Sequence, residues 1–408
     1  MTYDSDIIIV GGGLNGPTLA LACAQIGLSV TIIDALERGA RGAPTFDGRS
    51  YALALASSKL LEGIGVWPEL EPLAQPMLDI KVTDGRAGEG PSPFFMHFDH
   101  AEIEEGPMGF MVEDRHLRPA LMDAVDACPL ITCLNGAKVV AQNTDRAGAD
   151  VILACGKTIR GRVLVGCDGR ASGTAKRAKI SRTGWEYGQT ALVCAIEHEK
   201  PHSGIAHQFF MPAGPLAILP LTGNRCSIVW SETTANAAKI NALCDDDYLD
   251  VLRPRFGDFL GNITLSGARF TYPLNLSMTA TLIAPRTALV GDAAHGLHPI
   301  AGQGLNAGMR DIAALAEVIA DASRRGEDIG SDAVLGRYQQ WRRFDNAALA
   351  LATDTFNRLF SNDNPLLRTV RDLGMGIVSK VPALRRGFIR EAAGLNGDLP
   401  RLLKGQRL

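Results

Sequence analysis

Short, uninterrupted apolar runs that end in glycine-rich turns recur along the chain and predict buried strands. Residues 6–10 (DIIIV) form one such run, and residues 28–33 (LSVTII) form another. Residues 17–26 (PTLALACAQI), which lie between them, have the composition and length of a helix. Because β-branched runs without alternation fit strands that are buried on both faces, this order predicts a strand–helix–strand unit in a parallel sheet.

Two later segments repeat this pattern. Residues 163–168 (VLVGCD) and residues 287–290 (TALV) are apolar runs that lead into a glycine and an aspartate. From Ala307 onward, apolar residues recur at helical spacing on one face. A second strand–loop–helix unit therefore begins about 280 residues after the first.

The middle of the chain has a different pattern. Residues 205–210 alternate between apolar and polar positions, and residues 216–221 form a further apolar run. Turn-forming residues stand at 212–214 and 222–224. This pattern predicts antiparallel strands, and residues 331–408 are expected to be helical.

The first glycine-rich turn has the spacing of a dinucleotide-binding loop. Gly11 permits the tight turn, Gly13 lets the backbone approach a pyrophosphate, and Gly16 lets helix and strand pack closely. Asp34 ends the second predicted strand and can accept hydrogen bonds from a ribose diol. A glycine-rich turn alone is equally compatible with a structural role, but the flanking strand, helix and acid favour a dinucleotide.

The later strand–loop–helix unit can hold the other end of the same ligand. Asp292 follows a predicted strand, where its carboxylate can bind a polyol hydroxyl. Residues 302–306 form a glycine-rich helix N-terminus, which stabilises negative charge on a reduced flavin. The alternative is a structural loop that Asp292 caps.

Three motifs together identify a family resemblance. Residues 291–311 (GDAAHGLHPIAGQGLNAGMRD) resemble the GD motif of the FAD-dependent aromatic-ring hydroxylases, the para-hydroxybenzoate hydroxylase superfamily. Residues 163–172 resemble its DG motif. Residues 47–53, 187–192 and 214–221 resemble the ubiquinone-biosynthesis hydroxylase branch, and the tail is similar to the 2-polyprenyl-6-methoxyphenol hydroxylases of that branch.

The resemblance implies a fold and a division into domains. The fold would be α/β, with a Rossmann-like FAD-binding domain interleaved with an antiparallel-sheet substrate domain, followed by C-terminal helices. The FAD-binding domain would comprise residues 1–75, 106–178 and 275–330. Residues 76–105 and 179–274 would form the substrate domain, and residues 331–408 the helical region.

The resemblance also implies the chemistry. NAD(P)H, bound transiently, would reduce FAD, and a flavin C4a-hydroperoxide would hydroxylate a polyprenylated phenol in ubiquinone biosynthesis. The residues expected at the cofactor are Gly11, Gly13, Leu14, Asn15, Gly16, Asp34, Arg49, Arg115, Asp168, Gly291, Asp292, Pro299, Gly302, Gln303, Gly304, Leu305 and Asn306. Those expected near the substrate are Tyr187, Gln208, Phe210 and Leu219. No residue stands out as a catalytic base.

One position departs from the family pattern. Where the DG motif usually continues with an arginine, this chain has Ala175, followed by Lys176 and Arg177. Lys176 offers a cation there, but it cannot form the bidentate fork of an arginine.

Composition narrows the partners and the compartment. The 41 Lys and Arg nearly balance the 44 Asp and Glu, without a basic stripe that would bind nucleic acid. The eight cysteines lack a paired spacing, and His97 and His100 lack companion ligands, so we expect reduced thiols and no metal site. The chain contains no run of 18 apolar residues. We therefore expect a cytoplasmic bacterial protein.

A prenylated substrate would add a membrane surface and other ubiquinone-biosynthesis proteins as partners. The tail arginines Arg385, Arg386 and Arg390 near Phe388 could face the inner membrane, or they could form an ordinary solvated helix face. The oligomeric state stays open.

Two other functions fit the same motifs. One is hydroxylation of a soluble aromatic acid or phenol, for which Arg225 is the candidate carboxylate-binding residue in the substrate segment. The other is a non-catalytic flavin-binding subunit of a quinone-biosynthesis complex.

Overall fold

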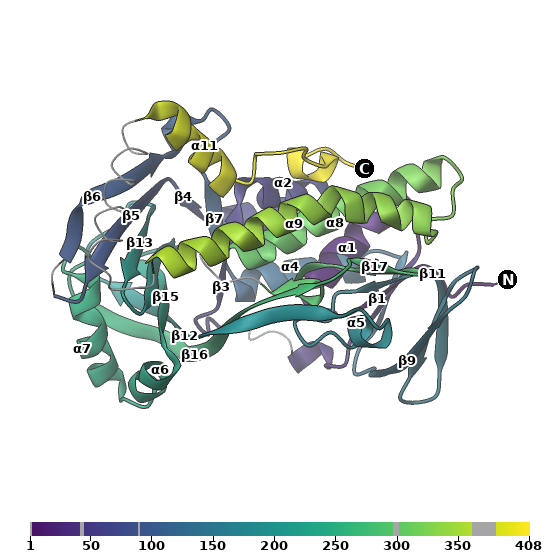
Figure 1. The fold of residues 1–408 in the computed structure, drawn as a ribbon, viewed down its shortest axis with the longest axis horizontal. Helices are drawn as coiled ribbons and strands as arrows, with labels where there is room; N and C mark the ends of the chain where they lie inside the picture. Colours follow the sequence, from purple (N-terminus) through teal and green to yellow (C-terminus); the bar gives the residue numbers. More distant parts are fainter. Residues whose placement is uncertain (1, 41–44, 89, 297–301, 361–380) are drawn as a thin grey trace.

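Two large sheets with helices packed on them form the molecule (Figure 1). The computed structural model describes residues 2–40, 45–88, 90–296, 302–360 and 381–408. In Figure 1 the first sheet lies on the right, near the N-terminus, and the second lies on the left. This mixed α/β architecture with C-terminal helices confirms the predicted fold class.

The first sheet contains the strands that the short apolar runs predict. Its order is β17 (Ile283–Ala284), β18 (Thr287–Leu289), β11 (Thr158–Gly166), β1 (Ser5–Val10), β2 (Val30–Ile33) and β8 (Ile131–Leu134). All of these are parallel except β17, while β9 (Val139–Thr144) and β10 (Ala149–Leu153) extend β11 as an antiparallel meander. The turns after β1, β11 and β18, which come from distant parts of the chain, therefore lie side by side.

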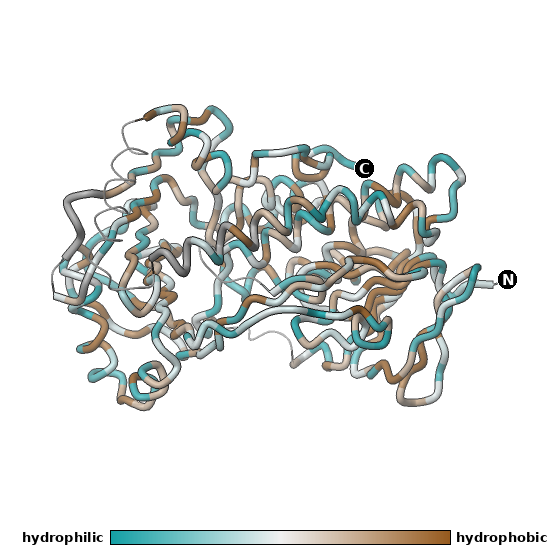
Figure 2. Tube along the Cα trace, in the orientation of Figure 1, coloured by the Kyte–Doolittle hydropathy of each residue, from teal (hydrophilic) through white to brown (hydrophobic). Residues whose placement is uncertain are grey.

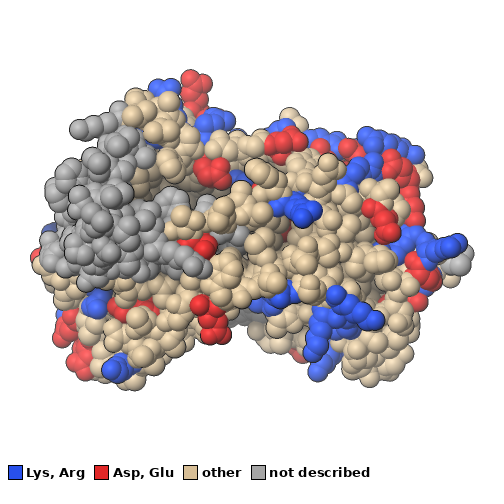
Figure 3. All heavy atoms as spheres, in the orientation of Figure 1, with Lys and Arg blue, Asp and Glu red and all other residues tan. Residues whose placement is uncertain are grey.

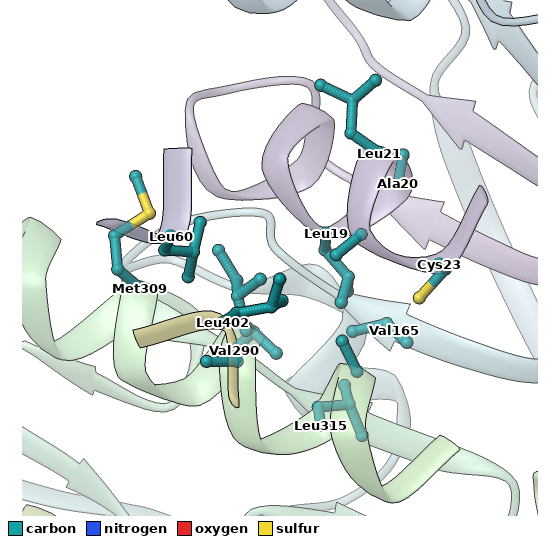
Figure 4. Packing of buried hydrophobic residues seen from close by; sticks show 14 of the residues in the cluster. Leu19, Ala20, Leu21, Cys23, Leu60, Val165, Val290, Met309, Leu315 and Leu402 are labelled. Carbon is teal, nitrogen blue, oxygen red and sulfur yellow. The ribbon is translucent and has the colours of Figure 1, made fainter. Parts of the chain in front are cut away.

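Helices cover this sheet and complete its core. They are α1 (Asn15–Ala24), α2 (Leu55–Gly63), α3 (Trp67–Leu70), α4 (Asp114–Asp126) and α8 (Gln303–Arg324). Figure 4 shows Leu19 of α1, Val165 of β11 and Leu315 of α8 in one buried cluster, and the sheet strands are among the most hydrophobic segments in Figure 2. The predicted helix begins two residues early, at Asn15, and tolerates Pro17 because first-turn N–H groups have no intrahelical acceptor.

The second sheet is antiparallel along most of its width. Its order is β19 (His295–Gly296), β16 (Ile263–Thr279), β12 (Arg182–His198), β15 (Arg225–Thr233), β14 (Gly214–Leu221), β13 (Ile205–Met211), β5 (Asp79–Arg86) and β6 (Gly90–Asp99). Strands β12 and β16 have 17 residues each and run from this sheet toward the first one (Figure 1). The predicted strands at 205–210 and 216–221 are confirmed as β13 and β14.

One face of the second sheet is covered by two helices. These are α6 (Thr234–Asn241) and α7 (Asp245–Phe256), which share a buried cluster with Leu192, Ile228 and Trp230. We call this the outer face and the opposite one the inner face. A small third sheet, β3 (Ser50–Ala54), β7 (Gly109–Glu113) and β4 (Gln75–Met77), lies beside β14.

The C-terminal region is helical where the structure describes it. Helix α9 (Asp332–Phe360) packs along α8, and α11 (Pro382–Ala392) contacts β6. Arg385 pairs with Glu102 at 2.6 Å and Arg390 pairs with Glu105. Two of the three arginines considered for a membrane surface are thus bound within the molecule.

Short helical segments complete the described chain. They are η1 (Arg38–Ala40), η2 (Glu71–Leu73), η3 (His100–Glu102), α5 (Gly173–Arg177), η4 (Gly291–Ala293) and η6 (Arg401–Lys404). In the part of the chain that the structure describes, no helix has the length and apolar character needed to cross a membrane.

Candidate functional site

A pocket of about 400 Å³ opens at the carboxyl ends of β1, β2 and β11. Open parallel sheets bind ligands at this edge, where the strands end and the loops diverge. The lining residues come from the first glycine turn, the end of β2, the start of β9 and the turn after β11: Val10, Gly11, Gly13, Ile33, Asp34, Ala35, Ala137, Lys138, Val139, Cys167, Asp168, Gly169 and Arg177.

The three glycines of the first turn have different neighbours. A Cβ on Gly11 would lie 2.3 Å from the Cys167 carbonyl oxygen, and one on Gly16 would lie 1.9 Å from the Gly11 carbonyl oxygen. A Cβ on Gly13 would meet nothing within 4 Å. Gly11 and Gly16 are therefore required by the protein's own packing, while Gly13 leaves a space beside the backbone that a pyrophosphate fits.

Asp34 lies in the pocket wall at the end of β2. Its Oδ2 accepts a hydrogen bond from Gly12 N, and its Oδ1 accepts one from Leu36 N at 2.7 Å. These bonds hold the carboxylate beside the glycine turn, where the ribose of a dinucleotide is expected.

Asp168 stabilises the turn after β11. Its carboxylate accepts hydrogen bonds from Ser172 Oγ, and from Thr174 N and Oγ1 at 2.9 Å each. It thereby fixes the start of α5. Ala175 is buried and Lys176 is exposed, but Arg177 lines the pocket and donates to Gln142 at 3.1 Å. Of the two cations that follow Ala175, Arg177 thus lies at the pocket, together with Lys138, and Lys176 does not line it.

The turn after β18 carries Gly291 and Asp292. Asp292 Oδ2 lies 3.5 Å from Arg170 Nε, and the Asp292 carbonyl accepts a hydrogen bond from Arg182 at 2.9 Å. The Asp292 side chain is 42% exposed, so it can reach a ligand. Pro299, which we expected at the flavin, lies outside the described residues.

Helix α8 begins directly after Gly302, whose φ of +65° is left-handed. A Cβ on Gly304 would meet nothing within 4 Å. The Asn306 side chain accepts hydrogen bonds from Ala54 N and Ser57 Oγ, and donates to the carbonyls of Ala52 and Gly302. Asn306 therefore fixes the helix start through its side chain, which leaves its backbone for the ligand role that the sequence predicts.

The remaining residues predicted at this helix start and at the first turn are buried or partly buried. Asn15 Nδ2 would lie only 2.1 Å from a Cβ on Gly291, so Gly291 makes room for the Asn15 amide. Leu14 is buried in the core, and Leu305 packs against it. Gln303 begins α8.

Sequence reasoning missed a buried charge network directly behind this turn. Asp311 of α8 is fully buried, and its Oδ2 accepts a hydrogen bond from Gly291 N at 3.0 Å. His295 Nε2 lies 2.6 Å from the same oxygen, and Arg342 of α9 donates to Oδ1 at 2.8 Å. Burial alone would raise the pKa of Asp311, but the charges of His295 and Arg342 hold that pKa well below its usual range.

Arg49 and Arg115 are both paired with carboxylates of the protein. Arg49 lies 2.7 Å from Asp47 and 3.5 Å from Asp114, which also binds Arg118. Arg115 Nε donates to Glu113 at 2.6 Å. Their contact with the cofactor stays a prediction.

The inner face of the second sheet carries three of the four predicted substrate residues. Strand pairing aligns Gln208 with Ala217, Val229, Val193 and Phe270 across β13, β14, β15, β12 and β16. All five are partly exposed. The neighbouring rows of the same face contain Phe210 and Leu219. This face is therefore mostly apolar.

Tyr187 lies at a different place from the other three. Its ring packs against Leu276 and Ala307, next to the start of α8. Its hydroxyl donates to Asp354 Oδ1 of α9 at 3.0 Å, and Trp185 donates to the same oxygen at 3.2 Å. Tyr187 thus lies beside the start of α8, a segment that the sequence predicts to contact the flavin.

Histidine and cysteine side chains do not gather into a metal site anywhere in the described ranges. His97 Nε2 lies 2.7 Å from Asp79, and His100 Nδ1 lies 3.0 Å from the Leu78 carbonyl. All eight cysteines fall in described positions and are free thiols. Burial raises the pKa of Cys226 to about 12, which keeps this thiol protonated.

The comparisons with known proteins agree with this geometry. Residues 4–350 match the family model for the FAD binding domain. The chain is 45% identical over 404 residues to the ubiquinone hydroxylase UbiL of Rhodospirillum rubrum. This alignment covers 98% of this chain and 93% of that protein. It is 33% identical to the 3-demethoxyubiquinol 3-hydroxylase of Escherichia coli (strain K12), and the alignment covers 96% of this chain and 99% of that protein.

A solved structure supports the fold independently. The p-nitrophenol 4-monooxygenase PnpA of Pseudomonas putida DLL-E4 superposes with a TM-score of 0.79 at 18% identity, over 97% of this chain and 99% of that one. At this identity the likeness shows the fold alone.

Proposed function

The chain belongs to the family of FAD-dependent monooxygenases that includes the ubiquinone hydroxylases, and from this premise we propose that it hydroxylates the ring of a polyprenylated phenol. The two curated relatives compared above are named for hydroxylations in the ubiquinone series. The proposal assigns the same class of substrate to this chain.

The observation that carries the proposal is the inner face of the second sheet. Its central row consists of Gln208, Ala217, Val229, Val193 and Phe270, which together offer one amide and otherwise apolar, mostly small side chains. Such a surface favours a neutral ring with an apolar substituent and keeps water away from the reacting atoms.

Arg225 argues against a carboxylate substrate. It lies on the inner face, but its Nη2 donates to Glu113 Oε1 at 2.6 Å, and its guanidinium stacks on the Phe46 ring at 4.6 Å. Glu113 is 2% exposed, and its buried carboxylate binds Arg225 through Oε1 and Arg115 through Oε2. Arg225 is therefore already bound within the protein, and a soluble aromatic acid is the weaker alternative as substrate.

The chain's own residues would bind and orient FAD. The first glycine turn and Asp34 suit the adenosine diphosphate part of FAD, and Asp292 suits the polyol chain. The first-turn N–H groups of α8 would stabilise negative charge on the flavin ring system, if FAD binds as the sequence predicts. FAD supplies the redox chemistry, with NAD(P)H as the electron donor and O₂ as the oxidant.

A prenylated substrate resides in a bilayer, so we also propose peripheral contact with a membrane. Leu384 and Phe388 of α11 are 48% and 41% exposed, and Arg386 beside them is exposed as well. Co-sedimentation with anionic vesicles tests this contact, and a protein that stays in the supernatant contradicts it.

A substrate comparison tests the proposed function. The purified enzyme with FAD and NAD(P)H is given a short-chain prenylphenol or 4-hydroxybenzoate, and hydroxylated product is measured with NAD(P)H consumption. We expect kcat/KM for the prenylphenol to be larger by about 100-fold or more, because several buried methylenes each contribute about 0.8 kcal/mol. Equal values, or prenylphenol-dependent oxidation that yields only peroxide, would contradict the proposal.

A further inference from the structure

Tyr272 of β16 lies on the inner face of the second sheet. Strand pairing sets it directly opposite Ala191 of β12, which pairs with Ser231 of β15. The adjacent Phe270 lies opposite Val193 on the same face, and the two aromatic rings stack with centroids 6.5 Å apart and planes 22° apart. The phenol ring of Tyr272 therefore extends over the surface assigned to the substrate.

The Tyr272 side chain is available to a ligand. It is 45% exposed, and its hydroxyl forms no hydrogen bond with any residue that the structure describes. Its neighbours in the row, Ala191 and Ser231, are small, so they leave room beside the ring. A ligand ring can lie there without displacing a large side chain.

The loop that carries Arg49 packs against this part of β16. Ala268 N donates to the Asp47 carbonyl at 3.0 Å, and a Cβ on Gly48 would lie 3.6 Å from Phe270 Cε2. A strand irregularity between Ser266 and Phe270 turns the backbone toward this loop. Tyr272 thus lies where the second sheet meets a loop that the sequence assigns to the cofactor.

The charges that face Tyr272 leave it protonated at neutral pH. Burial raises the pKa of its phenol above the ordinary value, Arg49 opposes part of this rise, and Asp47 and Asp114 add to it. A protonated phenol can donate a hydrogen bond to an oxygen as well as accept one.

The two glutamine side chains of the inner face are less suited than Tyr272 to donating a hydrogen bond to a ligand oxygen there. Gln189 Nε2 already donates to the Ala213 carbonyl at 2.7 Å. Gln208 lies on β13, four strands from β16, which is about 19 Å at the usual strand spacing. Among the described residues of the inner face, Tyr272 combines a hydroxyl that bonds to none of them with a position beside the Arg49 loop.

We propose that Tyr272 binds the phenolic oxygen of the substrate by a hydrogen bond and so sets which ring carbon faces the reacting oxygen. The assignment rests on the proposed function, because it presupposes a phenol ring on the inner face. It makes Tyr272 a specificity-determining residue that touches substrate.

Equilibrium binding to the FAD-loaded enzyme tests the assignment. The two ligands are a short-chain prenylphenol and the same compound without its hydroxyl, and the variants are wild type, Tyr272→Phe and Tyr3→Phe. Tyr272→Phe keeps the ring that stacks on Phe270. Tyr3 is a matched control, because it is 37% exposed and its hydroxyl bonds to the Ala147 carbonyl in the first-sheet region.

We expect wild type and Tyr3→Phe to bind the phenol about 3- to 10-fold more tightly than the deoxy compound. Tyr272→Phe should bind the two compounds equally, and it should form more peroxide per NAD(P)H consumed. A purely structural role for Tyr272 would leave the ratio unchanged.

The two proposals fail in different ways. If Tyr272→Phe keeps the full preference for the phenol, the Tyr272 assignment is wrong while the proposed function stands. If wild type binds neither compound and hydroxylates no prenylphenol, the proposed function is overturned, and the Tyr272 assignment with it.

Discussion

Three glycines of one motif have different partners. Gly11 and Gly16 have backbone atoms of the protein where a side chain would begin, whereas Gly13 has open space. A substitution at Gly16 therefore acts on folding, and a substitution at Gly13 acts on the ligand alone.

Gly13→Ala separates these effects. We expect its apoprotein to unfold at the same temperature as wild type, while its Kd for FAD rises about tenfold or more, because the added methyl occupies the space of the pyrophosphate. Gly16→Ala, the comparison variant, should lower the unfolding temperature even without FAD. Differential scanning fluorimetry of the apoproteins and FAD titration measure both quantities, and wild-type FAD affinity in Gly13→Ala would contradict the assignment.

The sequence predicts a residue's role where that role depends only on its near neighbours in the chain. The spacing of the glycines and Asp34 follows from one strand–turn–helix unit, so it could be read from the sequence. Arg177, Tyr272 and Asp311 could not, because their positions depend on pairing between segments far apart in the chain. The alternation of Phe270 and Tyr272 along β16 was a signal that could have identified that face.

At the scale of elements, helices α8 and α9 stabilise the turn after β18, which carries Gly291 and Asp292. Asp311 of α8 binds Gly291 N, His295 and Arg342 of α9 through one carboxylate. The sequence predicts α8 from apolar periodicity and a helical region over residues 331–408, but neither prediction includes the polar contact between the two helices. The long strand β16 was missed for a related reason, since its irregularity near Gly267 breaks the two-residue alternation.

Asp311→Asn should destabilise the protein by about 3–5 kcal/mol, because the buried Arg342 would lose its buried carboxylate partner and keep only the partly exposed Asp345. Asp321→Asn on the same helix is the matched control; Asp321 is 40% exposed and pairs with Arg401, so its loss should cost less than about 1 kcal/mol. Urea unfolding at neutral pH measures both.

The pH dependence provides a second test of the same carboxylate. Because the pKa of Asp311 is lower in the folded state than in the unfolded state, its contribution is complete above about pH 5 and is lost as the pH falls further. Wild type should therefore lose more stability than Asp311→Asn between about pH 5 and pH 3. Parallel losses in the two proteins would contradict the depressed pKa.

At the scale of the whole molecule, the ends of two long strands of the second sheet contact a turn of the first sheet: Arg182 of β12 donates to the Asp292 carbonyl, and Thr279 of β16 donates to the Ala294 carbonyl. β12 and β16 extend from the second sheet toward the turns after β11 and β18, so the inner face and the cofactor turns are parts of one connected framework. The domain boundaries that we drew from the sequence stay a prediction. Charge adds little at this scale, because basic and acidic side chains are interspersed on the face in Figure 3, apart from a basic group beside α5.

Isotope labelling tests the central claim, hydroxylation of a prenylated phenol, most directly. The FAD-loaded enzyme, NAD(P)H and a short-chain prenylphenol are incubated under ¹⁸O₂, and the product is examined by mass spectrometry. The account predicts one ¹⁸O atom on the ring for each NAD(P)H consumed in coupled turnover. Product oxygen that comes from water, or NAD(P)H oxidation that gives labelled peroxide and an unchanged phenol, would contradict it.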